Sequence, residues 1–259
     1  NEQNAVLAAD YSQIELRVIA ALAKDEAMIE AFRNGEDIHK ATAAKVFEVP
    51  LEEVSREQRS NAKTVNFGIV YGVSAFGLSQ QTDMSRKEAK AAIDGYFRTY
   101  PGIKSYMDDL VAFARENGYV ETITGRRRYL KDIESRNAVV RGHSERNAVN
   151  APIQGSAADI IKLAMIEIDR AMRAEGLKSK MLLQVHDELV FDAVEGELEA
   201  LKALVVEKME AAVEFCLFLS FPGVLLGCVA FALPACVSQV VLALSCIRGQ
   251  FVECVPWLL

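Results

Sequence analysis

Two short apolar runs, one near the start of the chain and one far along it, each lead into acidic residues. The run Ala5–Ala9 ends at Asp10, and the run Met181–Val185 meets a polar trio at 186–188 before a further apolar stretch begins. Short apolar runs bounded by polar residues are typical of buried strands. We therefore expect one strand that ends at a carboxylate, and one hairpin with acids at its tip.

The polar trio is His186, Asp187 and Glu188. A single Asp at a strand end is more often a cap or turn residue, but Asp10 and Asp187 each follow their own apolar strand. Mg²⁺ prefers oxygen ligands and usually takes one or two carboxylates plus substrate phosphates. Two such ions can stabilise the attacking and leaving oxygens of a phosphoryl transfer. Asp10 and Asp187 are therefore candidate ligands for two Mg²⁺ ions. Glu188 is either a third ligand or a hydrogen-bond acceptor within the sheet.

Most of the chain between these strands shows helical spacing of apolar residues, without regular alternation of strand and helix. This pattern indicates an α+β fold. We expect a helical stretch over 18–45 that is interrupted at Gly35, with Asp37 as the N-cap of its second part. Ser55 and Gln58 form a capping-box pattern at the start of the next helix.

Further helices and one hairpin are predicted beyond this point, from caps, prolines and turn residues. The first is a helix that begins at Ser85, with Glu88 as its capping-box partner, and the second is a helix from Pro101 to 117. They are followed by a hairpin over 120–127 and by two helices, over 137–150 and 155–175, that are separated by Pro152.

One of these helices carries four charged or aromatic residues at intervals of four, namely Arg59, Lys63, Phe67 and Tyr71. Residues at this spacing share one broad helical face. Cations lie at one end of the row and aromatic rings at the other, which is also the polarity of a nucleoside triphosphate. Arg and Lys bind phosphate oxygens, and rings offer a stacking surface for a base. An ordinary amphipathic helix with solvated cations and core aromatics is the alternative.

Together these stretches resemble the family A DNA polymerases, the bacterial DNA polymerase I type. The resemblance covers roughly residues 5 to 215 and keeps the order of the family's motifs. The matching segments are 10–17 (motif A), 59–72 (motif B), 185–188 (motif C), 146–155 (the template–primer segment) and 37–39, whose His reaches the incoming triphosphate.

The resemblance implies an antiparallel palm sheet with an inserted helical fingers subdomain. Residues 1–17 and 143–215 would belong to the palm, and residues 18–142 to the fingers. The chain has no starting Met, so we interpret it as a fragment that begins inside a domain. The family's thumb and any nuclease domain would then precede residue 1.

The resemblance also implies template-directed addition of deoxynucleotides to a primer 3′-hydroxyl with release of pyrophosphate, in DNA replication and repair. Asp10 and Asp187 would be catalytic and hold two Mg²⁺ ions, with Glu188 the less certain ligand. His39, Arg59 and Lys63 would contact the triphosphate, and Lys63 is also a candidate proton donor to the pyrophosphate.

The remaining site residues are assigned by the same resemblance. Phe67, Tyr71 and Gln13 would line the nucleotide site, and Glu15 would act as a steric gate beside the sugar 2′ position. The implied partners are primer–template DNA and deoxynucleoside triphosphates, with no obligate protein partner and no membrane. The residues that would contact DNA are Arg146, Asn150, Gln154 and His186.

Charge and targeting signals add little to this interpretation. The net charge of −7 argues weakly against nucleic-acid binding, although a local basic groove is sufficient. The densest basic cluster, Gly125–Lys131, is either part of such a groove or a solvated loop. No signal peptide is visible, and we expect a cytoplasmic protein.

The composition changes abruptly near residue 216. All five cysteines lie in the segment 216–259, where only Arg248 and Glu253 are charged. We interpret this apolar tail as a reading-frame error or a spurious join. A membrane anchor broken by Pro222 and Pro234 is the alternative, since the uncharged run is long enough to span a bilayer.

Two other functions remain open at this point. The chain would be a fragment that binds primer–template without extending it, if the missing parts are essential. It would be a membrane-attached protein if the apolar tail is genuine.

Overall fold

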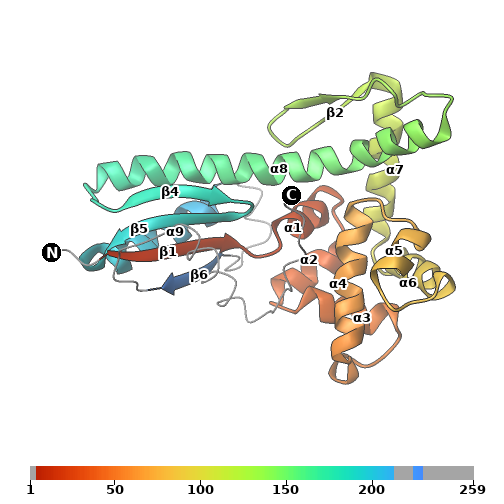
Figure 1. The fold of residues 1–259 in the computed structure, drawn as a ribbon, viewed down its shortest axis with the longest axis horizontal. Helices are drawn as coiled ribbons and strands as arrows, with labels where there is room; N and C mark the ends of the chain where they lie inside the picture. The colour runs from red at the N-terminus through yellow and green to blue at the C-terminus, as the bar shows by residue number, and fades with distance from the viewer. Residues whose placement is uncertain (1–3, 213–223, 230–259) are drawn as a thin grey trace, which may run out of the picture. The chain divides into compact units, whose positions relative to one another are not determined.

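The computed structural model describes residues 4–212 and 224–229, and these residues divide between two compact units (Figure 1). The first, which we call the sheet unit, contains residues 4–12, 163–212 and 224–229. The second, which we call the helical unit, contains residues 13–162. The long helix α8 (Ala138–Ala174) contributes residues to both.

The sheet unit is built on four strands in the order β4-β5-β1-β6, with every neighbouring pair antiparallel. The hairpin predicted around the polar trio is formed by two of them, and the first apolar run forms the strand beside it. The α+β class, with an antiparallel sheet, is therefore confirmed. The strands are β1 (Asn4–Tyr11), β4 (Lys180–Val185), β5 (Glu188–Val194) and β6 (Val224–Val229).

The core of the sheet unit lies between the central strands and a helix that packs against them, α9 (Leu198–Ala211), which follows the short 3-10 turn η2 (Glu195–Glu197). Leu7 on β1 and Phe191 on β5 are fully buried. The hydroxyl of Tyr11 donates a hydrogen bond of 2.6 Å to the backbone carbonyl of Met209 on α9. The end of β1, next to Asp10, is thus fixed to the layer behind it.

Strand β6 lies in the segment that the sequence analysis sets apart as an apolar tail. Its backbone pairs with β1 over the register Val6↔Val229 to Tyr11↔Val224. The rest of the predicted tail 216–259 lies outside the described residues. Among the residues that the structure describes, no helix is long and apolar enough to cross a membrane.

The helical unit consists of short helices and one small hairpin. Its elements are α1 (Ile14–Leu22), α2 (Glu26–Arg33), α3 (Ile38–Val46), η1 (Leu51–Glu53), α4 (Arg56–Val70), α5 (Ala75–Gln81), α6 (Arg86–Thr99), α7 (Pro101–Asn117), β2 (Tyr119–Glu121), β3 (Arg127–Tyr129) and the first part of α8.

Several of the predicted helix starts are confirmed. Ser55 and Ser85 both form complete capping boxes, with Gln58 and Glu88 as the reciprocal partners. Asp37 caps α3 by accepting hydrogen bonds from the backbone N–H groups of residues 39 and 40. Such caps satisfy N–H groups that have no partner inside the helix, so they are readable from local sequence.

Two helix predictions were wrong. The stretch 18–45 is three helices, because the side chain of Asp25 accepts a hydrogen bond from the N–H of Met28 and starts α2 as a separate helix. The predicted break at Pro152 is absent, since α8 continues through it. An internal proline removes one backbone hydrogen bond. Its neighbours Val149 and Ile153 are buried, and tertiary packing of this kind outweighs local propensity.

Candidate active site

The three acids of the predicted metal site lie together at one end of the sheet unit. Asp10 on β1 is directly opposite Glu188 on β5 in the antiparallel register. The backbone N–H of Tyr11 donates to the carbonyl of Asp187, at 3.2 Å. Residues directly opposite each other point to the same face of a sheet, with Cβ atoms about 5 Å apart. Backbone pairing therefore places Asp10 beside Glu188, with Asp187 next to them in the turn.

The turn that carries Asp187 has an unusual backbone. His186 has a φ of 54°, in the left-handed region that non-glycine residues seldom adopt. The side-chain amide of Gln184 donates a hydrogen bond of 2.8 Å to the carbonyl of His186 and supports this turn. His186 is exposed, whereas Asp187 is half-buried. Left-handed residues outside glycine cost about 1 kcal/mol or more, so the conformation is held by its surroundings.

The donor set at this end of the sheet is entirely oxygen. Within the described residues, no group of three or more His, Cys, Asp or Glu side chains is arranged to hold a metal ion by itself. Mg²⁺ requires fewer protein ligands, because substrate phosphates and water complete its octahedral shell. The half-buried pair Asp10 and Asp187 therefore fits Mg²⁺ in chemistry and number, with Glu188 as a neighbouring carboxylate.

In the helical unit, the predicted row of four lies along α4. Arg59, Lys63 and Phe67 are half-buried, and Tyr71, at the C-cap, is 41% exposed. The opposite face of the helix is buried and includes Val65. The aromatic residues of the row are therefore less buried than the residues of the opposite face.

Arg59 is held by an acidic residue on a neighbouring helix. Its Nε lies 2.7 Å from Oδ2 of Asp37, while Oδ1 of the same carboxylate caps α3. Burial alone would raise the pKa of Asp37. The hydrogen bond from the Arg59 side chain, followed by that from the N–H of Lys40, outweighs burial and holds this pKa below its usual value. Asp37 thus keeps a negative charge and fixes the guanidinium.

His39 lies in the first turn of α3 and is only 3% exposed. Its Nδ1 is 2.9 Å from the side-chain amide nitrogen of Asn66 on α4, and its Nε2 is 3.5 Å from that of Gln13. The ring also packs at a tilt against Phe67, with centroids 5.7 Å apart. Burial, more than any other effect, lowers the pKa of His39 to about 4, so the imidazole is neutral near pH 7.

Two further predicted residues are joined directly. The hydroxyl of Tyr71 donates a hydrogen bond of 2.8 Å to Oε2 of Glu15, on α1. Gln13, the N-cap residue of α1, has a φ of 58° and is left-handed like His186. One predicted residue of motif A and one of motif B are therefore joined by a side-chain hydrogen bond within the helical unit.

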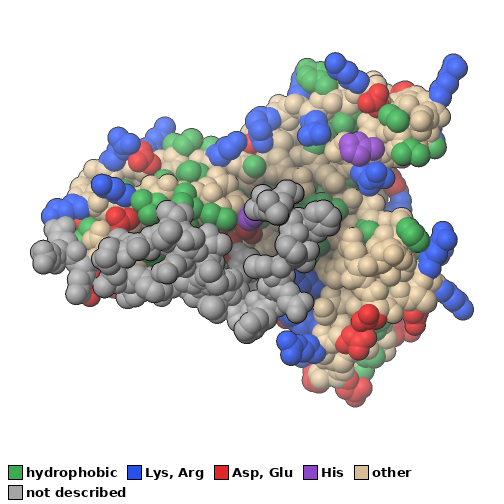
Figure 2. Space-filling model, viewed as in Figure 1, with side chains coloured by type: hydrophobic (Ala, Val, Ile, Leu, Met, Phe, Trp, Pro, Cys, Tyr) green, Lys and Arg blue, Asp and Glu red, His purple; other side chains and the backbone are tan. Residues whose placement is uncertain are grey.

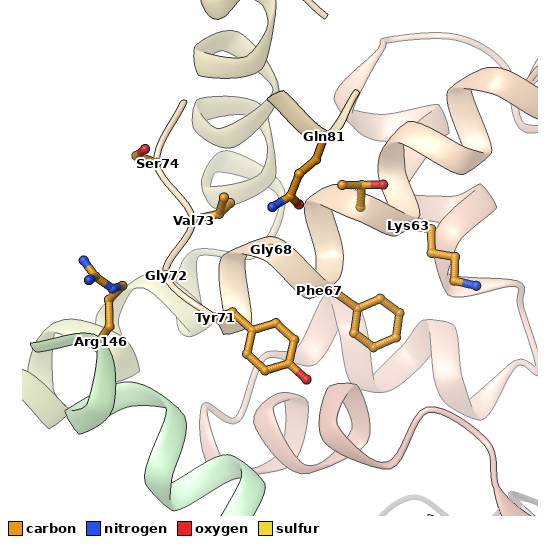
Figure 3. A pocket seen from close by; sticks show the side chains of 10 residues that line it. Lys63, Phe67, Gly68, Tyr71, Gly72, Val73, Ser74, Gln81 and Arg146 are labelled. Carbon is orange, nitrogen blue, oxygen red and sulfur yellow. The ribbon is translucent and has the colours of Figure 1, made fainter. Parts of the chain in front are cut away.

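The row borders a cavity of about 660 Å³ within the helical unit (Figure 3). Lys63, Phe67 and Tyr71 line one side, and Arg146 reaches it from α8 next to Gly72. Gly72 has a φ of 69°, and a Cβ there would lie 2.8 Å from Cγ of Arg146. Only glycine fits this backbone and this close approach.

The three predicted DNA contacts of α8 follow one another at intervals of four. Arg146 and Gln154 are exposed, while Asn150 between them is half-buried. Their spacing places them along one face of the helix. Oδ1 of Asn150 is buried and has no hydrogen-bond partner among the described residues.

Sequence and structure comparisons place this chain among known proteins. A model of the family described as DNA polymerase family A matches residues 1–224. The chain belongs to DNA polymerase family A. The predicted resemblance is confirmed, and the match extends slightly beyond the range 5–215 expected from the motifs.

Curated relatives in this family are bacterial DNA polymerase I enzymes. The chain is 56% identical over 214 residues to that of Streptococcus pneumoniae serotype 4, in a match covering 82% of this chain and 24% of the relative. It is 55% identical over 208 residues to that of Geobacillus stearothermophilus, covering 80% and 24%. The chain thus spans about a quarter of the length of these relatives.

A solved structure also matches closely. It is described as the POL domain of Pol1 from M. smegmatis in complex with DNA primer-template and dNTP. The TM-score is 0.83 at 46% sequence identity, and the match covers 89% of this chain and 40% of that one.

The basic cluster of this family A chain is an ordered hairpin. The hairpin β2–β3 is attached to α8 through Asp159, which accepts hydrogen bonds from Thr122 (2.7 Å) and Thr124 (2.5 Å) and pairs with Arg126 (2.7 Å). Burial alone would raise the pKa of Asp159, but these hydrogen bonds and the Arg126 charge hold it below its usual value. Figure 2 shows several Lys and Arg side chains, interspersed with other types, on the part of the surface where this hairpin lies.

Sequence reasoning missed two residues of the candidate site. Asp37 was predicted only as a helix cap, and its ion pair with Arg59 was not expected. Asn66 lies between two members of the row, yet it was given no role. The sequence signal that could have identified Asn66 is a polar residue among the apolar residues of the buried part of α4. Its side chain is fully inaccessible to solvent.

Proposed function

We propose that this chain catalyses template-directed DNA synthesis, adding deoxynucleotides to a primer 3′-hydroxyl with release of pyrophosphate. The proposal places this activity in bacterial DNA replication and repair, in the cytoplasm. It is supported by membership of DNA polymerase family A and by relatives named DNA polymerase I.

One observation carries the proposal, namely the accessible row on α4 beside an open cavity. Lys63, Phe67 and Tyr71 line this cavity, with the cation toward one end and the rings toward the other. A nucleotide has the matching distribution of charge and flat surface. We infer that the row binds the triphosphate at its cationic end and the sugar and base at its aromatic end.

Charge on the triphosphate is balanced by residues of α3 and α4. Arg59 contributes a planar fork of donors and Lys63 a point charge, both suited to phosphate oxygens. His39 adds a neutral hydrogen-bond donor. Charge grows on the leaving pyrophosphate during the reaction, so these donors act most strongly in the transition state. Lys63 is the candidate that transfers a proton to the leaving group.

The acids at the end of the sheet would hold two Mg²⁺ ions. Asp10 and Asp187 are the proposed ligands, and Glu188 is either a further ligand or a hydrogen-bond acceptor. When bound, the ions supply Lewis-acid stabilisation to the attacking and leaving oxygens. The hydrogen bond between the Tyr11 N–H and the Asp187 carbonyl keeps the turn and β1 together, so the carboxylates remain adjacent.

Selection for deoxynucleotides is assigned to Glu15. Its carboxylate accepts a hydrogen bond from Tyr71, which restricts its rotation. A fixed carboxylate beside the sugar would exclude a 2′-hydroxyl by contact, while Gln13 and Phe67 complete the same wall of the site.

Primer–template DNA is the proposed partner. Arg146, Asn150 and Gln154 on one face of α8, with His186 at the hairpin tip, would contact the duplex near the primer end. The matching POL domain is described in complex with DNA primer-template and dNTP. Base pairing with the template, rather than these side chains, would select the nucleotide.

The proposed subdomains keep the boundaries suggested by the motifs. The palm comprises 1–17 and 143–215, and the fingers comprise 18–142. The compact units divide the chain after residues 12 and 162, five residues before the first proposed boundary and twenty residues after the second. The family model ends at residue 224, and the segment 225–259 is proposed to be foreign to the family.

Single-nucleotide primer extension with Mg²⁺ tests the proposal on the full 259-residue chain. The wild-type chain should extend a primer, and Asp187→Asn should not. Asp192→Asn is the matched control, because it removes one acidic charge from the same hairpin but lies on β5 away from the turn. It should extend the primer like the wild type.

Two other outcomes would change the conclusion. Extension by Asp187→Asn at the wild-type rate would remove Asp187 from the proposed catalytic residues. A folded wild-type chain that binds primer–template, measured by fluorescence anisotropy, but extends nothing would overturn catalysis by this chain. Because the chain spans only about a quarter of its relatives, that outcome identifies a fragment that binds DNA without acting on it.

A further inference from the structure

A buried pair of polar side chains, His39 and Asn66, joins α3 to α4. Asn66 is fully inaccessible and His39 is 3% exposed. The face of α4 around Asn66 is otherwise apolar, with Val65 and Ile69 also buried. Burying an amide in such surroundings is unfavourable unless it is hydrogen-bonded. The pair therefore needs an explanation beyond packing.

The amide of Asn66 makes one hydrogen bond that the structure describes. Its Nδ2 lies 2.9 Å from Nδ1 of His39. Its Oδ1 is buried and has no partner among the described residues. A buried oxygen without a donor lowers stability by about 1 kcal/mol or more.

That bond has a consequence for the proton on the ring. A neutral imidazole has one N–H donor and one bare acceptor nitrogen, and the partner at one nitrogen decides which is which. An amide N–H that donates to Nδ1 requires Nδ1 to be the acceptor. The amide nitrogen of Gln13 also faces the ring, at Nε2, but at 3.5 Å and from a half-buried side chain. The 2.9 Å contact of the fully buried Asn66 is the stronger one, and it puts the ring proton on Nε2.

We propose that Asn66 is a positioning residue that holds His39 in the Nε2–H tautomer, so that the imidazole donates a hydrogen bond to a phosphate oxygen of the incoming nucleotide. This proposal rests on the proposed function of His39 as a triphosphate contact. It assigns Asn66 a role that the row on α4 does not include, because Asn66 is buried beside the row and acts through His39.

The charges around the ring support a neutral donor. Burial is the largest effect on its pKa and favours the neutral form. The negative charge of Asp37 raises the pKa of His39, whereas the positive charges of Arg59 and Lys63 lower it further. With cations already beside the phosphate site, a neutral donor adds a hydrogen bond without requiring a further buried charge. A neutral ring needs the correct tautomer, since the other one would present a bare nitrogen to phosphate.

The tautomer can be read directly by ¹⁵N NMR of the imidazole nitrogens in the full, nucleotide-free chain. The sequence contains three histidines, so loss of one signal in His39→Gln assigns the ring. The expected spectrum shows His39 protonated on Nε2 at pH 7. A proton on Nδ1 would overturn the proposal, and this measurement needs no substitution at Asn66.

Variants extend the test. Asn66→Asp places an acceptor at Nδ1, so the ring proton should move to Nδ1 or the ring should become charged. Asn61→Asp adds the same charge elsewhere on α4, and the His39 spectrum should remain that of the wild type. An unchanged spectrum in folded Asn66→Asp would contradict the proposal.

The kinetic effect should appear in the catalytic efficiency for the nucleotide. Asn66→Leu removes the amide at similar volume, and we expect kcat/KM for the deoxynucleotide to fall about tenfold, with a loss in kcat because His39 acts most strongly in the transition state. If the wild type extends primers but its His39 carries the proton on Nδ1, only this inference fails. If the wild type extends no primer, the proposed function fails, whereas the NMR result still decides the tautomer.

Discussion

The two compact units fix their candidate site residues in different ways. In the sheet unit, Asp10 and Glu188 are adjacent because their backbones are paired in register. In the helical unit, Arg59 and His39 are fixed by side chains, namely those of Asp37 and Asn66.

This difference predicts how each site responds to the substitution of a side chain. A backbone register is shared among many hydrogen bonds, so replacing one side chain leaves the positions of its neighbours unchanged. A side chain fixed by a single partner loses its orientation when that partner is removed. We therefore expect substitutions in the sheet unit to separate activity from stability, and substitutions around α3 and α4 to affect both.

The largest effect is expected for Asp10→Asn. Loss of one carboxylate should lower the primer-extension rate about a thousandfold, since a metal contributes several kcal/mol to transition-state stabilisation. The free energy of unfolding should stay equal or rise, because repulsion between adjacent acids is relieved. Primer extension and urea unfolding measure the two quantities. A loss of stability of about 1 kcal/mol or more would break the contrast between the units.

The next effect concerns pH and His39. The unfolded ring takes up a proton near pH 6.5, whereas the folded ring does so only near pH 4. As the pH falls through this window the unfolded state binds more protons, so the folded state loses about 3 kcal/mol. Urea unfolding between pH 7 and 4 should show this loss in the wild type.

The control for this prediction uses a second histidine. His39→Gln should remove that part of the pH dependence, and His143→Gln, at an exposed position on α8, should retain it. If the free energy of unfolding depends on pH equally in the wild type and in His39→Gln, protonation of the buried ring is not coupled to folding.

The smallest effect is expected at Asp37. Asp37→Ala removes the cap of α3 and the partner of Arg59, and should lower the free energy of unfolding by about 1 kcal/mol. Asp37→Asn keeps an oxygen for the cap and should cost less. A comparison of both variants by urea unfolding separates the cap from the ion pair. Equal losses would assign the effect to charge alone.

Local signals in the sequence were sufficient for much of the fold. The caps at Ser55 and Ser85, the two apolar strands and the hairpin with acids at its tip all depend on neighbouring residues. The separation of α1 from α2 was missed although its signal, the cap residue Asp25, is also local. The continuity of α8 through Pro152 depends on tertiary packing. A single sequence does not contain that information in readable form.

The candidate site was predictable to a similar degree. The residues of the α4 row could be recognised from their spacing. The pairs Asp37–Arg59 and Glu15–Tyr71 join residues far apart in the chain. The choice of partner depends on how the helices pack, so these pairs became visible only in three dimensions.

The attachment of the β2–β3 hairpin has a mechanical consequence. Asp159 binds Thr122, Thr124 and Arg126, while Ser156 of α8 accepts a separate bond from the N–H of Ile123. The attachment is redundant, because several bonds hold the same two elements together. Loss of one bond leaves the others in place, so the hairpin and this part of α8 move as one rigid body when a force acts on either.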